Sequence, residues 1–155
     1  MVKKSLIPEV VGLKFESDKM KILLFTFYYP PDLSAGSFRA VALIEALSKK
    51  ISSEDELHVV TTHPNRYFSH KVIAKDNELN GNIKIHRVKV PSHNGGMVSQ
   101  IRTFVVFAWY AMQYCSNLRP NFIIGTTSRL MTGLLAGFLA KIFRCKYFID
   151  LRDIF

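Results

Sequence analysis

No stretch of the sequence is long and apolar enough to cross a bilayer, which takes about 18 consecutive apolar residues. The longest candidate, Phe104–Met112, is bounded by Thr103 and Gln113, and the next, 130–140, is interrupted by a threonine and two glycines. Residues 1–19 carry scattered charges and no long apolar centre, so they do not predict a signal peptide. We therefore expect a cytoplasmic protein.

Cysteine is scarce, and the motifs of metal and dinucleotide sites are missing. Cys115 and Cys145 have no metal-binding or redox spacing, which favours buried free thiols. The histidines show no metal-ligand spacing either, so we expect no metal and no bound cofactor. The loop after the first apolar run contains no Gly-x-Gly-x-x-Gly motif, which argues against a nucleotide-dependent oxidoreductase.

Carboxylates are absent from nearly half of the chain. Residues 79–149 contain no Asp or Glu but nine Lys or Arg, whereas the first 78 residues contain 11 basic and 10 acidic groups. Almost the whole net charge of +9 therefore lies in the second half, which suggests an anionic partner such as a membrane or nucleic acid. Nucleic acid is the poorer fit, because the aromatic residues lie in apolar runs and are not interleaved with basic ones.

The sequence that is present is organised around Lys21–Lys50. Its apolar run from Ile22 to Phe27 is too short for a helix and is closed by two prolines, as is typical of a strand buried on both faces. After a short polar loop, the apolar residues take helical spacing up to Ser48. The free backbone N–H groups where that helix starts, around Ser34–Ser37 and close to Arg39, predict an anion site.

Later apolar runs predict four more strands and two more helices. The strands are expected at Leu57–Thr62, Ile83–Val90, Phe122–Gly125 and Cys145–Leu151, and the helices at Val98–Leu118 and Leu130–Phe143. Residues 63–81 are expected to form a long polar loop with a little local structure. This order predicts an α/β fold: a Rossmann-like, doubly wound, mostly parallel sheet with helices on both faces. The domain is expected over residues 20–155, after a poorly ordered extension over residues 1–19.

Three polar clusters follow the carboxyl ends of predicted strands, and we expect them to share one site. They lie at Pro30–Arg39, at Thr126–Arg129 and at Asp150–Asp153. In open parallel sheets, ligands bind outside the carboxyl ends of the strands, at the point where strand order reverses. The sequence therefore predicts a binding site on this rim of the sheet.

The order of these motifs resembles a known family. In YYPPDLSAGSFRAVALIEALSK, LHVVTTHPNRY, IKIHRVKVP, TSRLMTGLLAGFLAK and FIDLRDIF, the chain is similar to the amino-terminal half of family 4 glycosyltransferases, which have the two-domain GT-B fold. The resemblance covers Lys21–Phe155 and is to the bacterial members that make surface polysaccharide, capsule and lipopolysaccharide. It implies transfer of a sugar from a nucleotide-sugar to an acceptor, often lipid-linked, with retained anomeric configuration and no metal.

The chain departs from the family pattern in two ways. Ala35-Gly36 stands where the family usually has a Gly-Gly pair, and the donor-binding carboxyl-terminal domain is absent from the sequence. The resemblance therefore implies an acceptor-side half that is inactive alone and needs a carboxyl-terminal domain or a partner chain. The alternative is a non-catalytic Rossmann-like module that binds an anionic ligand or a partner protein.

The resemblance also assigns candidate site residues, each with a structural alternative. The substrate-binding candidates are Ser34, Ala35, Gly36, Ser37, Arg39, Thr127, Ser128 and Arg129, and the catalytic candidates are Asp153 and Arg152. The first group would contact the donor diphosphate or position the acceptor, or it would simply cap two helices. Asp153 would act on the acceptor hydroxyl while Arg152 pairs with a phosphate, or the pair would hold the strand end together with a structural Asp150.

The acid-free second half also predicts where the protein works. Helices 98–118 and 130–143 are rich in apolar and aromatic residues, so they could rest on an anionic membrane surface with basic residues at the headgroups. Alternatively, helix 98–118 packs between the sheet and the missing domain. The first interpretation places the protein at the inner face of the plasma membrane, as a peripheral protein with a lipid-linked or glycan acceptor.

Overall fold

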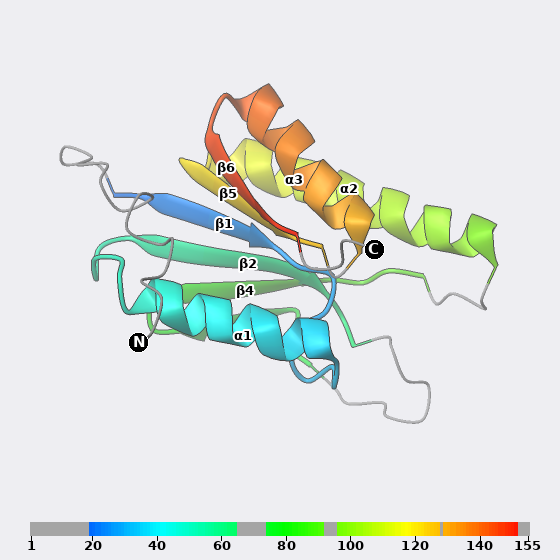
Figure 1. Ribbon diagram of the computed structural model, residues 1–155, viewed down its shortest axis with the longest axis horizontal. Coiled ribbons are helices and arrows are strands. Elements are labelled where there is room, and N and C mark those ends of the chain that lie inside the picture. The colour runs from blue at the N-terminus through cyan, green and yellow to red at the C-terminus, as the bar shows by residue number, and fades with distance from the viewer. Residues whose placement is uncertain (1–18, 65–73, 92–95, 128, 152–155) are drawn as a thin grey trace, which may run out of the picture.

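The structure is a computed structural model that describes residues 19–64, 74–91, 96–127 and 129–151. The expected extension over residues 1–19 lies outside them, except for Lys19. The described elements are β1 (Lys21–Phe25), α1 (Ala35–Ser48), β2 (Glu56–Thr62), β3 (Asn77–Asn80), β4 (Ile83–Val88), α2 (Met97–Leu118), β5 (Phe122–Thr126), α3 (Leu130–Phe143) and β6 (Lys146–Asp150). The predicted α/β class is confirmed, with helices on both faces of the sheet (Figure 1).

The six strands lie in the order β3-β4-β2-β1-β5-β6. All neighbouring pairs are parallel except β3 and β4, which form an antiparallel hairpin. The chain builds outwards from β1 through β2 to β4 and then returns to the other side of β1 with β5. Strand order therefore reverses between β1 and β5, which is where ligands bind in sheets of this kind.

The polar segment predicted over residues 63–81 contains one element of local structure among its described residues, the strand β3, whose position the sequence did not indicate. The segment Asn77–Asn80 has no apolar alternation, and Leu79 is exposed. It becomes a strand because Gly81, in the left-handed conformation with a φ of 60°, turns the chain back so that it pairs with β4. This strand forms because it pairs with β4, and the pattern of its own residues does not predict that pairing.

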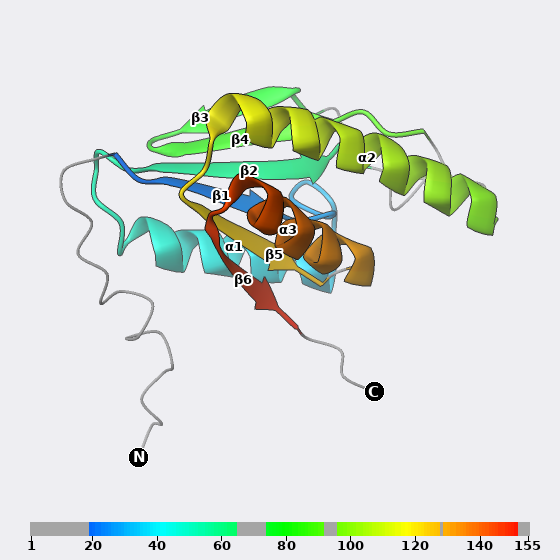
Figure 2. The same cartoon turned by 90° about the horizontal axis from the view of Figure 1, so that it is seen from above.

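Alternation along β1 divides the core between two faces of the sheet. Leu23 and Phe25 belong to a cluster that is covered by α2 and α3, and Ile22 and Leu24 belong to a cluster covered by α1. Figure 2 shows α1 on one side of the sheet and the other two helices on the opposite side. No residue of β6 belongs to the described cluster on the α1 side, so that face of β6 lies outside the core.

Helix α3 lies unusually close to the sheet because glycines face each other across their contact. A Cβ on Gly125 of β5 would lie 2.5 Å from the Cβ of Ala136, and one on Gly133 would lie 2.9 Å from Cγ2 of Thr127. Neither Cβ can be added unless the atoms that it meets shift. None of the helices among the described residues combines the length and apolarity that a membrane span requires.

Candidate functional site

The three predicted polar loops meet at one edge of the sheet, which we call the carboxyl-end rim. Its described residues are 26–37, 126–127, 129 and 150–151. The Thr126 hydroxyl donates to Oγ1 of Thr26 at 3.1 Å, which joins the ends of β5 and β1. The Thr127 hydroxyl donates to the carbonyl of Asp150 at 2.9 Å, which joins the ends of β5 and β6. The predicted convergence of these loops is therefore present in the fold.

The loop after β1 is held in place by buried donors from neighbouring strands. The Thr62 hydroxyl donates to the carbonyl of Phe27 at 2.7 Å, and Nη2 of Arg87 donates to the carbonyl of Pro30 at 2.7 Å. Arg87 is itself fixed by an ion pair with Glu78 at 2.9 Å, and its side chain is 2% exposed. A loop anchored at successive carbonyls presents the start of α1 at a fixed position on the rim.

The first turn of α1 leaves two backbone donors facing the rim. Ser34 caps the helix, because its Oγ accepts from the N–H of Ser37 at 3.1 Å. Within the described part of the chain, the N–H groups of Ala35 and Gly36 have no acceptor, as is usual at a helix start. Ala35 is exposed and Gly36 is half-buried, so an anion can approach both, whereas the Ser37 side chain is buried.

Two predicted arginines supply positive charge near this helix start. Nε and Nη2 of Arg129 donate to the hydroxyl of Tyr28 at 3.3 and 3.1 Å, and the guanidinium carbon lies 4.0 Å from the centroid of the Phe27 ring. This stacking fixes the guanidinium against β1 although Arg129 comes from the start of α3. Arg39 is exposed on α1, and neither arginine pairs with a carboxylate among the described residues.

The other predicted site residues have structural roles or are not described. The side-chain oxygens of Ser34 and Thr127 form the cap and the strand link given above. Ser128, Arg152 and Asp153 lie outside the described residues.

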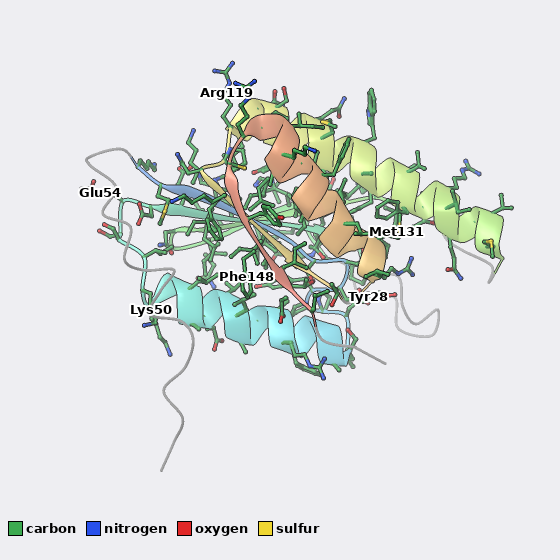
Figure 3. The ribbon with its side chains drawn as sticks, turned by 45° about the horizontal axis from the view of Figure 1, so that its top comes forward. Tyr28, Lys50, Glu54, Arg119, Met131 and Phe148 are labelled. Atoms are coloured by element: carbon green, nitrogen blue, oxygen red, sulfur yellow. The ribbon has the colours of Figure 1, made fainter. Side chains whose placement is uncertain are left out.

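Exposed apolar side chains border the cationic part of the rim. Leu33 and Phe38 flank the start of α1, and Leu130 and Met131 form the first turn of α3; each is at least half exposed. Figure 3 shows Tyr28 and Met131 at the same end of the molecule, away from Lys50 at the far end of α1. An anionic head group and an apolar chain would therefore both find matching surface here.

Sequence reasoning missed three buried polar residues that shape the rim. Tyr28 holds Arg129, Asp32 is 5% exposed in the loop before α1, and Arg87 supports that loop from β4. Burial by neighbouring strands lifts the pKa of Tyr29 above its usual value, although Arg87 beside it opposes this rise. One feature of the sequence pointed to one of these residues: in β4 the apolar alternation changes phase next to Arg87.

A second polar group, which we call the His–Tyr cluster, lies between α2 and the sheet. Its residues are Glu56, His58, Asn77, His86 and Tyr114. Glu56 Oε2 lies 3.1 Å from His58 Nε2, and Nδ1 of that ring lies 2.7 Å from the Tyr114 hydroxyl. The same hydroxyl bonds Nε2 of His86, whose Nδ1 lies 2.7 Å from the Asn77 amide. This chain of contacts links α2 to β2, β4 and β3.

The proton positions in the His–Tyr cluster follow from the acceptors at its two ends. The Nε2–H of His58 donates to Glu56 and the Nδ1–H of His86 donates to Oδ1 of Asn77, so each neutral ring turns a nitrogen without a proton towards the Tyr114 hydroxyl, which donates to one of them. Burial lowers the pKa of His58, and burial followed by the charge on His58 lowers that of His86 to about 4. Hydrogen bonding by Lys84 is the main reason why the pKa of Glu56 falls well below its usual value. Both rings are therefore neutral at pH 7.

The His–Tyr cluster is not part of the rim. Glu56 is the first residue of β2, so the cluster lies towards the amino end of that strand, whereas the rim lies at the carboxyl ends. It therefore stabilises the contact between α2 and the sheet. Among the described residues no group of His, Cys, Asp and Glu is arranged to hold a metal ion.

Comparison with known proteins does not name a family for this chain. No protein-family model matches the sequence, and no curated protein matches it significantly. The geometry of the rim, together with the motif resemblance described above, is therefore the basis for a function.

Proposed function

We propose that this chain is the acceptor-side half of a retaining glycosyltransferase, which transfers a sugar from a nucleotide-sugar to a lipid-linked or polysaccharide acceptor. The observation that carries this proposal is the composition of the rim. It combines two free amides at the start of α1, the guanidinium of Arg129 held against Tyr28, and an exposed apolar border. An amphiphile with a phosphate head group matches this surface, because its phosphate suits the amides and the guanidinium and its chain suits the apolar border.

In this proposal, the polar part of the rim binds the head group of the acceptor and the apolar border binds its chain. The N–H groups of Ala35 and Gly36 and the guanidinium groups of Arg39 and Arg129 would hold phosphate oxygens. The apolar chain of the acceptor would lie against the exposed side chains of Met131 and its neighbours as it extends away from the rim. Arg152 and Asp153 follow β6 directly, and we assign them the phosphate and acceptor-hydroxyl roles that the family resemblance implies. No metal or bound cofactor is needed for this assignment.

The surface of α2 and α3 supports a membrane-bound acceptor. Large apolar side chains are exposed along both helices: Met97, Val98, Ile101, Val105, Trp109, Tyr110, Leu130, Met131, Leu134, Phe138 and Ile142. Exposed Arg102, Arg119, Lys141 and Arg144 lie among them, and the sequence from 79 to 149 has no carboxylate to repel an anionic leaflet. We therefore propose peripheral binding at the inner face of the plasma membrane.

The chain should bind acceptor without transferring sugar. In the GT-B arrangement that residues 21–155 resemble, the nucleotide is held by a second domain, and these residues correspond to the acceptor side alone. We expect the purified chain to have negligible affinity for nucleotide-sugars by itself.

Calorimetric titration with geranyl diphosphate, a soluble amphiphile with a diphosphate head, tests the rim. The wild-type chain should bind it, and Arg129→Gln should weaken binding at least tenfold, because one charge-assisted contact is worth about 1.5–3 kcal/mol. Lys50→Gln is the matched control, since Lys50 is an exposed cation at the far end of α1 (Figure 3). Equal affinities of all three proteins would contradict the proposed rim.

Nucleotide-sugars and anionic vesicles separate the proposal from its main alternative. Binding to anionic vesicles that weakens with salt, together with negligible nucleotide binding, supports an acceptor-side half. Tight nucleotide-sugar binding without vesicle affinity would instead mean a self-sufficient Rossmann-like binding module, and the glycosyltransferase proposal would fail.

A further inference from the structure

The β3–β4 hairpin is connected to the carboxyl-end rim by one buried side chain, Arg87. In the sheet, β2 lies between β4 and β1, so the guanidinium reaches across the end of β2 before Nη2 donates to the carbonyl of Pro30 at 2.7 Å. Neighbouring strands lie about 4.8 Å apart, and only a long side chain spans from one strand to the second one along. Arg87 therefore joins the hairpin at one side of the sheet to the loop that follows the central strand β1 (Figure 2).

Further contacts fix this guanidinium from the side of the hairpin. Nη1 lies 2.9 Å from Oε1 of Glu78 in β3, and it also donates to the carbonyl of Lys75 at 3.3 Å. The side chain of Arg87 is 2% exposed, and that of Glu78 is 35% exposed. Because the guanidinium is planar, the directions of its donors are fixed relative to one another. A shift of Glu78 would therefore move the donor that holds the carbonyl of Pro30.

Short backbone contacts continue from this loop to the start of α1. The N–H of Asp32 donates to the carbonyl of Tyr29 at 3.1 Å, and the N–H of Ser34 donates to the carbonyl of Asp32 at 3.2 Å. The Tyr29 ring is buried, and the guanidinium carbon of Arg87 lies 6.0 Å from its centroid. Ser34 then caps the helix. Two hydrogen-bonded turns therefore separate the part of the loop that Arg87 holds from the free amides at the helix start.

Stability alone is a weak reason for a buried guanidinium at this place. Taking the charge out of water costs free energy that pairing recovers only in part, and apolar residues of similar volume often stabilise a fold equally well. An apolar residue in place of Arg87 could not donate to a carboxylate and to two carbonyls in fixed directions. The arginine is therefore better explained by the position that it gives to the loop.

We propose that Arg87 and Glu78 are positioning residues for the anion site of the rim. Together they hold the loop after β1 so that the amides of Ala35 and Gly36 face the ligand, which neither of the two side chains would contact. The inference rests on the proposed function, because it concerns the site that binds the phosphate head group, and it adds the β3–β4 hairpin to the support of that site. Donors that are already ordered bind more tightly than donors that become ordered on binding. The affinity for phosphate therefore depends on an ion pair outside the site.

Amide hydrogen exchange of the whole chain without ligand, followed by nuclear magnetic resonance, tests the positioning itself. Arg87→Lys keeps a charge beside Glu78 but lacks the planar fork that holds the loop, so the N–H groups of Asp32 and Ser34 should exchange about tenfold faster. The N–H groups of β1 should exchange at the wild-type rate. Ile85→Val, directly opposite Glu78 in the hairpin, removes one buried carbon and is the matched control, which should change neither loop amide. Wild-type exchange of both loop amides in Arg87→Lys would overturn the proposal.

Calorimetric titration of the same variants with geranyl diphosphate measures the consequence for the site. Arg87→Lys and Glu78→Gln should each weaken binding about fivefold, and Ile85→Val should bind as the wild type does. The double variant should bind no more weakly than Arg87→Lys, because both substitutions disable one contact. Wild-type affinity of Arg87→Lys, or fully additive losses, would overturn the inference. A wild type that does not bind geranyl diphosphate would refute the proposed function, and the exchange measurement would then decide by itself whether Arg87 positions the loop.

Discussion

Lowering the pH from 7 to 5 should destabilise the fold through the His–Tyr cluster. At pH 7 the two rings are neutral, and the Tyr114 hydroxyl lies between one unprotonated nitrogen of each ring and donates to one of them. If both rings gain protons, both donate to the same oxygen, and the Tyr114 proton loses its acceptor. Two like charges would then face each other in stacked rings whose centroids are 5.9 Å apart. Protonation therefore opposes the packing of α2 on the sheet.

The size of this effect follows from the pKa of His86. Its folded pKa is about 4, against 6.5 for an unperturbed ring, so the unfolded chain binds the proton more readily between these values. Stability is therefore complete near pH 7 and is lost as the pH falls through 6.5 towards 4. Between pH 7 and 5 the linkage relation gives about 2 kcal/mol for His86 alone. His58, whose pKa is also lowered, adds to the loss.

Protonation of the Glu56 carboxylate changes the stability of the fold only in a lower pH range. The pKa of Glu56 falls from its model-compound value of 4.5, so its contribution is present above that value and is lost only below it. Urea unfolding followed by far-ultraviolet circular dichroism at pH 7, 6 and 5 therefore isolates the histidines. His86→Gln should remove about 2 kcal/mol of the pH-dependent loss, whereas His63→Gln, outside the cluster, should retain it.

Two results would refute this reasoning. One is a wild-type free energy of unfolding that changes by less than about 0.5 kcal/mol between pH 7 and 5, since the linkage relation demands several times more. The other is a His86→Gln variant with the full wild-type pH dependence. Either would mean that the rings are not held neutral between α2 and the sheet.

Other predictions concern packing, capping and the exposed face. Gly125→Ala should destabilise the fold by about 1–3 kcal/mol in urea unfolding, because the new Cβ would lie 2.5 Å from that of Ala136, whereas Gly137→Ala has room and should be neutral or slightly stabilising. Ser34→Ala should cost about 1 kcal/mol by removing the α1 cap, and an unchanged unfolding midpoint would contradict that role. Trp109 is 64% exposed and is the single tryptophan, so its fluorescence should shift to the blue on vesicles with anionic lipid and remain unchanged on neutral ones.

Most of the fold could be predicted because its signals are local. The run Ile22–Phe27 and its prolines marked the central strand, and the apolar spacing of Leu130–Phe143 matched α3 at both ends. Helix α1 begins at Ala35, ahead of the apolar positions that indicated it, because the Ser34 cap and not apolar spacing sets its start. Strand β3 was missed because its formation depends on pairing with β4, which no pattern within Asn77–Asn80 reveals.

The candidate site was predictable in place but not in detail. Parallel topology brings the carboxyl ends of β1, β5 and β6 together, so the meeting of their loops followed from strand order alone. The contact of Arg129 with Tyr28 joins residues 101 positions apart, and the support of the loop by Arg87 spans 57 positions. Contacts between residues this far apart in the chain arise from tertiary structure, and they cannot be inferred from the pattern of a single sequence.

Nuclear magnetic resonance of the isotope-labelled chain with geranyl diphosphate tests the central claim most directly, because it locates the ligand residue by residue. The account predicts shifts of the amide signals of Ala35 and Gly36 and of the Arg129 side chain, with little change at His58 in the His–Tyr cluster. Shifts confined to residues away from the rim, or no shifts at millimolar ligand, would contradict an acceptor site at the start of α1.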